Sequence, residues 1–237
     1  MTPAYLRNLF QSARSGRRGG SVALLGIDGS GKTAHALELV SWFKDRGYPC
    51  TRVPFHHYLV VDKLFMRRSL SGRRKAGDTV LGLRKGGNPL RPLLSALDNF
   101  LLYAVSSFGR GIEGRVIVYD RFSWSTYVKY KALGYPVGGL KWIFFLPAPS
   151  CAFLLDVPVR RSLDVIASRP GHFRYTGTVL AKERDEYLEI ARSKGLTVID
   201  TTRDRVEVQE QIENHLGRVF PVARTQRLNH RKGSVRG

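Results

Sequence analysis

The sequence predicts a single α/β domain with a mostly parallel five-stranded sheet and helices on both faces. Three observations lead to this prediction. Short apolar runs alternate with longer segments whose apolar residues recur at helical spacing, a pattern typical of strand–helix–strand units. A glycine-rich loop separates the first such run from the first helical segment. Two later runs end in carboxylates, Asp120 and Asp156, at the sheet edge where ligands bind in this fold class.

The first strand and helix flank the most informative stretch. Residues 21–25 read Ser-Val-Ala-Leu-Leu and predict a buried strand, and residues 34–44 carry an apolar stripe that predicts a helix. The stretch between them fits the P-loop pattern G-x-x-x-x-G-K-[ST] at every required position: Gly26, Ile27, Asp28, Gly29, Ser30, Gly31, Lys32 and Thr33. Strand, loop and helix are the context that this motif requires.

The chemistry follows from these residue types. Glycines let successive backbone N–H groups point at phosphate oxygens, and the positive end of the helix dipole lies beside them. Lys32 is expected to reach the β- and γ-phosphates and Thr33 to ligate Mg²⁺, so ATP and Mg²⁺ are the expected cofactors. Two alternatives are a chance glycine-rich turn and a site that binds nucleotide without turnover.

The remaining elements follow in order along the chain. Strands are expected at 50–53, 115–119, 152–155 and 196–199, and helices at 93–108, 124–132, 158–166, 180–193 and 206–216. In the helix over 180–193, Glu183, Glu186 and Glu189 are expected to face water. The strand over 115–119 resembles a Walker B strand.

Asp120 and Arg121 follow that strand. The carboxylate is expected beside the Mg²⁺ ion, and the guanidinium is expected to neutralise phosphate charge during transfer; the alternative is a surface ion pair. Because parallel strands end at one edge, five residues are expected to approach one crevice: Asp28, Arg52, Asp120, Asp156 and Thr201.

The charge is strongly basic. Lys and Arg total 39 against 19 Asp and Glu, and the net charge of +20 favours polyanionic partners such as nucleotides or nucleic acid. Basic residues concentrate in an N-terminal arm (1–20), a flap (about 63–91) and a C-terminal tail (218–237) that is expected to be disordered. The flap is interpreted as a cover over an anionic substrate, a nucleic-acid contact or a solvated loop.

Location and metal binding have weaker signals. The arm superficially resembles a mitochondrial transit peptide, but a basic arm is the preferred interpretation. We expect a cytoplasmic protein without a transmembrane segment, with mitochondrial import left open, and two buried thiols, Cys50 and Cys151. His56 and His57 lack a third ligand at suitable spacing, so ordinary loop histidines are favoured over zinc.

Taken together, the motifs resemble the thymidylate kinase family of P-loop nucleoside monophosphate kinases. The loop carries an acidic residue at Asp28, as is common in that family, and Asp120-Arg121-Phe122, followed by Ser125 and Thr126, is similar to its Asp-Arg-aromatic signature. Residues 154–158, 187–191 and 198–200 resemble its later elements. The resemblance spans about 21–216, within an expected kinase domain at 21–217, and implies a P-loop NTPase fold.

The resemblance also implies site roles. Asp28 is expected to contact the acceptor sugar or its phosphate, Arg52 the acceptor phosphate, and Asp120 and Arg121 the acceptor and the transferred phosphoryl group. A lid is expected at about 167–179, with its candidate cations at Arg169, His172 and Arg174.

Departures from the family concern base recognition. The family's base-reading Arg falls near Asn99, and the helix over 93–108 contains no Arg. The family's Gln-containing loop after the Ser is absent, and the basic flap is not typical. The apolar helix over 93–108 fits a homodimer interface, as in the family, or core packing equally well.

The leading functional hypothesis is transfer of a phosphoryl group from ATP to a nucleoside monophosphate, with dTMP as the first acceptor considered. One alternative is a P-loop kinase of another acceptor, either a small molecule or a nucleic-acid end. The other is an ATP-binding protein that associates with nucleic acid and lacks kinase turnover.

Overall fold

The computed structural model describes residues 19–54, 90–108, 115–146, 148–168 and 176–221. Its strands are β1 (Gly20–Leu25), β2 (Cys50–Pro54), β3 (Val116–Asp120), β4 (Cys151–Asp156) and β5 (Thr197–Asp200). Its helices are α2 (Lys32–Asp45), α3 (Leu90–Phe108), α4 (Ser123–Ala132), η2 (Gly138–Leu140), α5 (Lys141–Phe145), α6 (Val159–Ala167), α7 (Gly177–Lys194) and α8 (Arg205–Val219).

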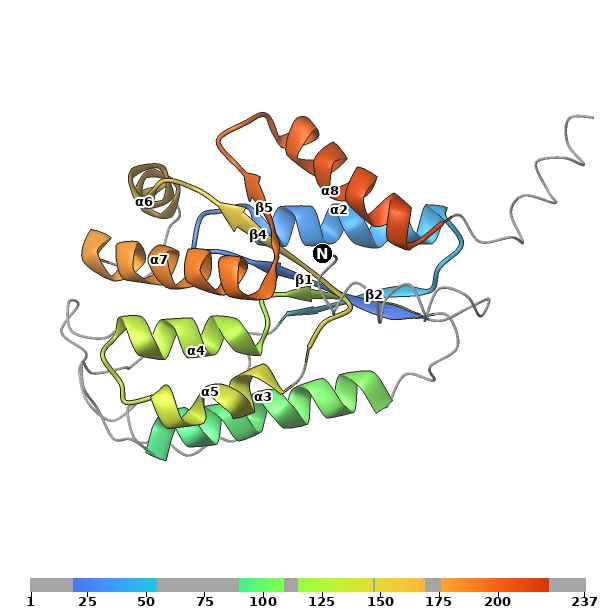
Figure 1. Ribbon diagram of the computed structural model, residues 1–237. Coiled ribbons are helices and arrows are strands. Elements are labelled where there is room, and N and C mark those ends of the chain that lie inside the picture. The colour runs from blue at the N-terminus through green and yellow to red at the C-terminus, as the bar shows by residue number, and fades with distance from the viewer. Residues whose placement is uncertain (1–18, 55–89, 109–114, 147, 169–175, 222–237) are drawn as a thin grey trace, which may run out of the picture.

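The five strands form one sheet in the order β2-β3-β1-β4-β5, and every neighbouring pair is parallel. Helices α2 and α8 cover one face, and α3, α4, α5 and α7 lie on the other (Figure 1). The predicted α/β fold with helices on both faces is therefore confirmed.

Each face of the sheet has its own hydrophobic core, because successive side chains along a strand point to opposite faces. In β1, Val22 and Leu24 pack in the core beneath α2 and α8. Ala23 and Leu25 pack in the core shared with α3, α4, α5 and α7. All four side chains are fully buried, so β1 is the central strand of a covered sheet.

Helix α7 differs from the expectation at one position. Thr176 caps its start, with its hydroxyl accepting from the Val179 N–H, and Gly195 ends it in the left-handed conformation. Glu189 is exposed as expected, but Glu183 is only 2% exposed. The prediction that Glu183 faces water was wrong, because α7 packs against α4 along this side.

Helix α3 buries polar residues and exposes several apolar ones. Ser95, Asp98 and Asn99 are buried, whereas Leu97 and Val105 are 46% and 65% exposed. Core packing within the described residues therefore does not account for these two apolar side chains. A homodimer through this helix stays a prediction.

The C-terminal helix continues past the expected domain end at residue 217. The Phe220 ring is buried and packs edge-on against Phe43, with their centroids 5.2 Å apart. The Tyr48 hydroxyl donates to the Pro221 carbonyl at 2.7 Å. The start of the expected tail at 218 was therefore wrong, since residues 218–221 belong to the folded body.

Much of the basic sequence lies outside the described residues, including 1–18 of the arm, 63–89 of the flap and 222–237 of the tail. Within the described ranges, no helix combines the length and apolar character needed to cross a membrane. Cys50 and Cys151 are both buried, as expected.

Candidate functional site

The glycine-rich loop joins β1 to α2 and passes close to β4 and α6. Gly26 has φ +137°, and a Cβ there would lie 2.4 Å from the Leu155 carbonyl oxygen. Gly29 has φ +82°, and a Cβ there would lie 3.0 Å from the carbonyl oxygen of Ser162. These two positions therefore require glycine, both for the backbone conformation and for the close approach.

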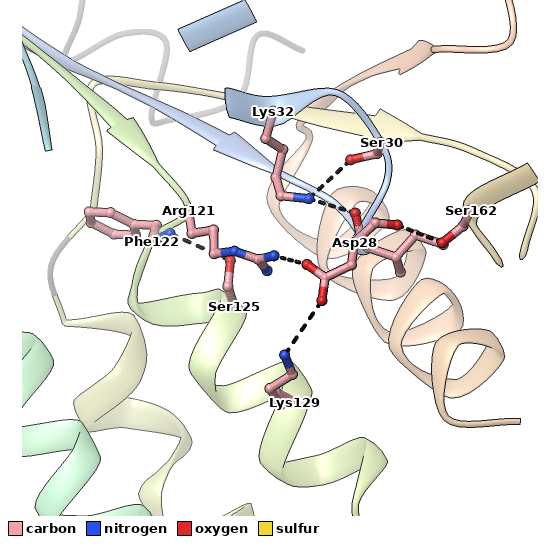
Figure 2. A network of polar contacts seen from close by, with 9 residues as sticks. Asp28, Ser30, Lys32, Arg121, Phe122, Ser125, Lys129 and Ser162 are labelled. Carbon is pink, nitrogen blue, oxygen red and sulfur yellow. Dashed lines mark hydrogen bonds and ion pairs between the residues drawn. The ribbon is translucent and has the colours of Figure 1, made fainter. Parts of the chain in front are cut away.

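Lys32 begins α2 and folds back into the loop. Its Nζ donates to the Ile27 carbonyl at 2.5 Å and to the Ser30 hydroxyl at 3.1 Å (Figure 2). The side chain is buried, whereas Thr33, next along the helix, is exposed. The loop therefore surrounds the Lys32 ammonium at the N-terminus of a helix. Backbone N–H groups and a cation in this arrangement are suited to binding phosphate.

Asp120 ends β3 at the carboxyl edge of the sheet. It is in register with Leu24 on one side and with Pro54 on the other. Its Oδ2 accepts from Nη1 of Arg52 at 3.1 Å. Its Oδ1 is buried and has no hydrogen-bond partner among the described residues, which leaves this carboxylate oxygen without a compensating donor there.

Arg121 follows in an unusual conformation. Its backbone N–H donates to the Leu24 carbonyl at 3.2 Å, and its φ is +74°. Its guanidinium pairs with the carboxylate of Asp28 (Figure 2). A left-handed conformation at a residue with a side chain costs about 1 to 2 kcal/mol and concentrates at functional sites.

The turn after Arg121 is fixed by Ser125. The Phe122 N–H donates to the Ser125 hydroxyl at 3.4 Å at the start of α4. Thr126, the next residue of the predicted signature, is buried in the same helix. The signature thus contains a helix cap that holds the backbone presenting Arg121.

A second cation, Lys129, approaches Asp28 from α4. Its Nζ lies 3.8 Å from Asp28 Oδ2, and its side chain is 12% exposed. Burial lowers the pKa of the Lys129 ammonium to about 8, an effect that Glu183 opposes and Arg121 strengthens. Sequence reasoning missed this residue, because its burial depends on how α4 and α7 pack together.

Asp156 and Thr201 form a separate group at the ends of β4 and β5. Arg184 makes two hydrogen bonds to the Asp156 carboxylate, at 2.7 and 2.8 Å. The Thr201 hydroxyl donates to the Asp156 carbonyl at 2.9 Å. Of the five residues expected in one crevice, Arg52 therefore contacts Asp120 and Thr201 contacts Asp156, while Asp28 pairs with Arg121.

Asn99 lies on the face of α3 that meets α4. One turn before it, the Ser95 hydroxyl lies 2.6 Å from the Tyr130 hydroxyl, and one turn after it, the Tyr103 ring packs against Phe122. Within the part of the chain that the structure describes, Asn99 Nδ2 is buried without a hydrogen-bond partner. This side chain places an uncompensated polar group in the interface between the two helices.

Several predicted residues lie outside the described ranges. These are Arg169, His172 and Arg174 of the lid, and His56 and His57. Across the ranges that are described, no cluster of three or more His, Cys, Asp or Glu side chains is suited to a metal ion. Mg²⁺ does not require such a cluster when substrate phosphates complete its ligands, and the uncompensated Asp120 Oδ1 fits this mode of binding.

Comparison with known proteins places this geometry in a family. No protein-family model matches the chain. The chain is 34% identical over 188 residues to a probable thymidylate kinase of Pyrococcus horikoshii, covering 73% of this chain and 83% of that protein. It belongs to the thymidylate kinase family.

Other comparisons agree with this assignment. A probable thymidylate kinase of Thermococcus kodakarensis is 29% identical, covering 81% of this chain and 94% of that protein. A solved deoxyadenosine kinase from M. mycoides matches with a TM-score of 0.54 at 15% identity, covering 84% of this chain and all of that one. That likeness concerns the fold. The protein is a P-loop nucleoside monophosphate kinase, and its reaction class is phosphoryl transfer to a nucleotide.

Proposed function

We propose that this thymidylate kinase family member transfers the γ-phosphoryl group of ATP to dTMP, giving dTDP and ADP, with Mg²⁺ as cofactor. The observation that carries the proposal is the convergence of Lys32, Asp120 and the Asp28–Arg121 pair at one edge of the sheet. The archaeal relatives named as probable thymidylate kinases support dTMP as the acceptor.

The donor is held by the loop from Gly26 to Thr33. Its backbone N–H groups and the Lys32 ammonium would contact the ATP phosphates. The Thr33 hydroxyl and the Asp120 carboxylate, directly or through water, would hold Mg²⁺. When bound, this ion neutralises charge on the phosphates and orients them for in-line transfer.

The acceptor is held from the other side. Arg52, already paired with Asp120, would anchor the acceptor phosphate, and Asp28 would contact the acceptor sugar or phosphate. Arg121 would neutralise charge on the moving phosphoryl group, assisted by the lid cations Arg169 and Arg174. No covalent intermediate is needed, since phosphoryl transfer is promoted by positioning and charge.

Base recognition is assigned to the interface of α3 and α4. The family's Arg falls near Asn99, whose Nδ2 has no hydrogen-bond partner among the residues that the structure describes. A buried amide donor suits a carbonyl oxygen on the acceptor base, and thymine offers two. The amide would thus take over a role that a longer cation performs elsewhere in the family.

The test is ADP release from ATP and Mg²⁺ against a panel of nucleoside monophosphates, with Lys32→Ala as the blank. We expect turnover with dTMP that is lost in the variant. Turnover only with another monophosphate would replace the acceptor and keep the mechanism. If no monophosphate supports ADP release while ATP still binds, the result would favour a different acceptor or a nucleotide-dependent binding role for the basic segments.

A further inference from the structure

Asp28 is shared between two cations on different oxygens. Arg121 pairs with Oδ1, and Lys129 lies 3.8 Å from Oδ2 (Figure 2). The two cations reach the loop from opposite ends of the same segment, since Arg121 precedes α4 and Lys129 lies two turns into it. The Asp28 backbone is held separately, because the Ser162 hydroxyl donates to its carbonyl at 2.5 Å.

Pairing with Asp28 conflicts with the role proposed for Arg121. A guanidinium that neutralises the moving phosphoryl group must turn part or all of its donors away from Asp28. The Asp28 side chain is only 18% exposed, so it would lose its nearest cation in a partly desolvated place. Removing one partner of such a pair is costly, because an uncompensated charge is left behind.

Lys129 is placed to remove this cost. Among the described residues, charged groups face its ammonium from three sides: Asp28 from the loop, Glu183 from α7 and Arg121 from the start of α4. Glu183 is buried, and its Oε1 has no hydrogen-bond partner in the described ranges. At 3.8 Å the contact with Asp28 is longer than a close ion pair, and a small movement of the flexible lysine side chain would shorten it.

We propose that Lys129 is a positioning residue that takes over Asp28 when Arg121 turns to the transferred phosphoryl group. This inference rests on the proposed function, because it explains how Arg121 becomes available for transfer. Lys129 acts through Asp28 and Arg121, and it does not touch the reacting atoms. The lowered pKa of about 8 agrees with an ammonium that is poorly solvated and gains from a closer carboxylate.

The kinetic test is a double-mutant cycle between Lys129 and Asp28. Lys129→Met should lower kcat about 10- to 100-fold with little change in the acceptor KM, because Arg121 then stays bound to Asp28. Lys129→Arg should restore most of the rate. In an Asp28→Asn background no carboxylate remains to be neutralised, so Lys129→Met should have almost no further effect. If Lys129→Met lowers kcat by the same factor in the wild-type and Asp28→Asn backgrounds, the proposal is overturned and a structural role is indicated.

The matched control is Lys131→Met. Lys131 lies on the same helix and pairs with Glu186 on a more exposed side, at 2.6 Å. We expect its loss to leave kcat and KM unchanged. A loss of rate equal to that of Lys129→Met would show that any lysine removal from α4 disturbs the site.

A second readout does not depend on the acceptor. The titration of Lys129 can be followed by carbon-13 NMR of lysine side chains, with its signal assigned by Lys129→Arg. Binding of ATP should draw Arg121 away and raise the Lys129 pKa above about 8. An unchanged pKa in the ATP complex would overturn the inference, even if dTMP is phosphorylated. A raised pKa without turnover of any monophosphate would keep the inference and reject the proposed function. Absence of ATP binding would overturn both.

Discussion

The Arg121 guanidinium pairs with the Asp28 carboxylate and so joins the residue after β3 to the loop after β1. The backbone of Arg121 reaches this position through a left-handed conformation, with φ +74°. The chain therefore accepts local strain in order to present one cation to the P-loop.

Arg121→Ala and Arg121→Gly should distinguish the catalytic contribution of the Arg121 side chain from the strain of its left-handed backbone. Both variants lack the cation, so both should lose transfer by about 10²-fold or more. Glycine adopts positive φ without a Cβ penalty, so Arg121→Gly should be about 1 kcal/mol more stable than Arg121→Ala. Urea unfolding of the two variants measures the difference. Equal stability would show that the left-handed backbone is not strained.

Arg52 offers a test of acceptor binding. Its guanidinium contacts Asp120 at 3.1 Å and is 28% exposed, so its remaining donors are available to an acceptor phosphate. Arg52→Met should raise the acceptor KM by about tenfold or more and alter the ATP KM little. Arg52→Lys should have an acceptor KM between those of the wild type and Arg52→Met. A selective rise in the ATP KM would place Arg52 on the donor side instead.

Asn99→Leu tests whether Asn99 contributes to base recognition or to the stability of the fold. Since Asn99 Nδ2 has no hydrogen-bond partner in the described part of the chain, an apolar side chain of similar size should leave the free energy of unfolding unchanged within about 1 kcal/mol. The KM for dTMP should rise, because the base loses a donor. Ser106→Ala is the control on the same helix: its hydroxyl lies 2.9 Å from the Tyr119 hydroxyl, so its removal should cost about 1 kcal/mol without changing KM. An unchanged dTMP KM in Asn99→Leu would remove Asn99 from the acceptor site.

Lys129 should make stability depend on pH. Burial holds its pKa at about 8 in the folded chain, below the value of about 10.4 for an unfolded lysine. Between these values the unfolded state binds more protons, so folding becomes more favourable as pH rises through this window. The free energy of unfolding of the wild type should therefore rise relative to Lys129→Met between pH 8 and about 10. Urea denaturation of both proteins across this range measures it, and a constant difference would contradict the lowered pKa.

The sequence was sufficient for the features that depend on local pattern. The loop and the position of Asp120 at a strand end follow from motif spacing and from the parallel sheet. Lys129 and Glu183 could not be found in this way, because their burial depends on how α4 and α7 pack together. Helix α5 was not predicted, since five apolar or amphipathic residues between breaks do not distinguish a helix from a strand.

Helix α3 shows a further limit of pattern reasoning. Its leucines recur at helical spacing and predict the helix, and Leu97 and Leu101 are exposed while Asp98 and Asn99 are buried. The hydrophobic pattern therefore gives the helix but not which of its faces is buried. The burial of these polar side chains runs against the usual rule, and the base recognition that we propose between α3 and α4 would account for it at Asn99.

The central claim is tested most directly by following a radiolabelled γ-phosphoryl group from ATP in the presence of dTMP and Mg²⁺. The account predicts labelled dTDP from the wild-type protein and none from Lys32→Ala of unchanged fold, checked by circular dichroism. Label that remains in ATP or appears only as inorganic phosphate with the wild type, or labelled dTDP formed by Lys32→Ala, would contradict it.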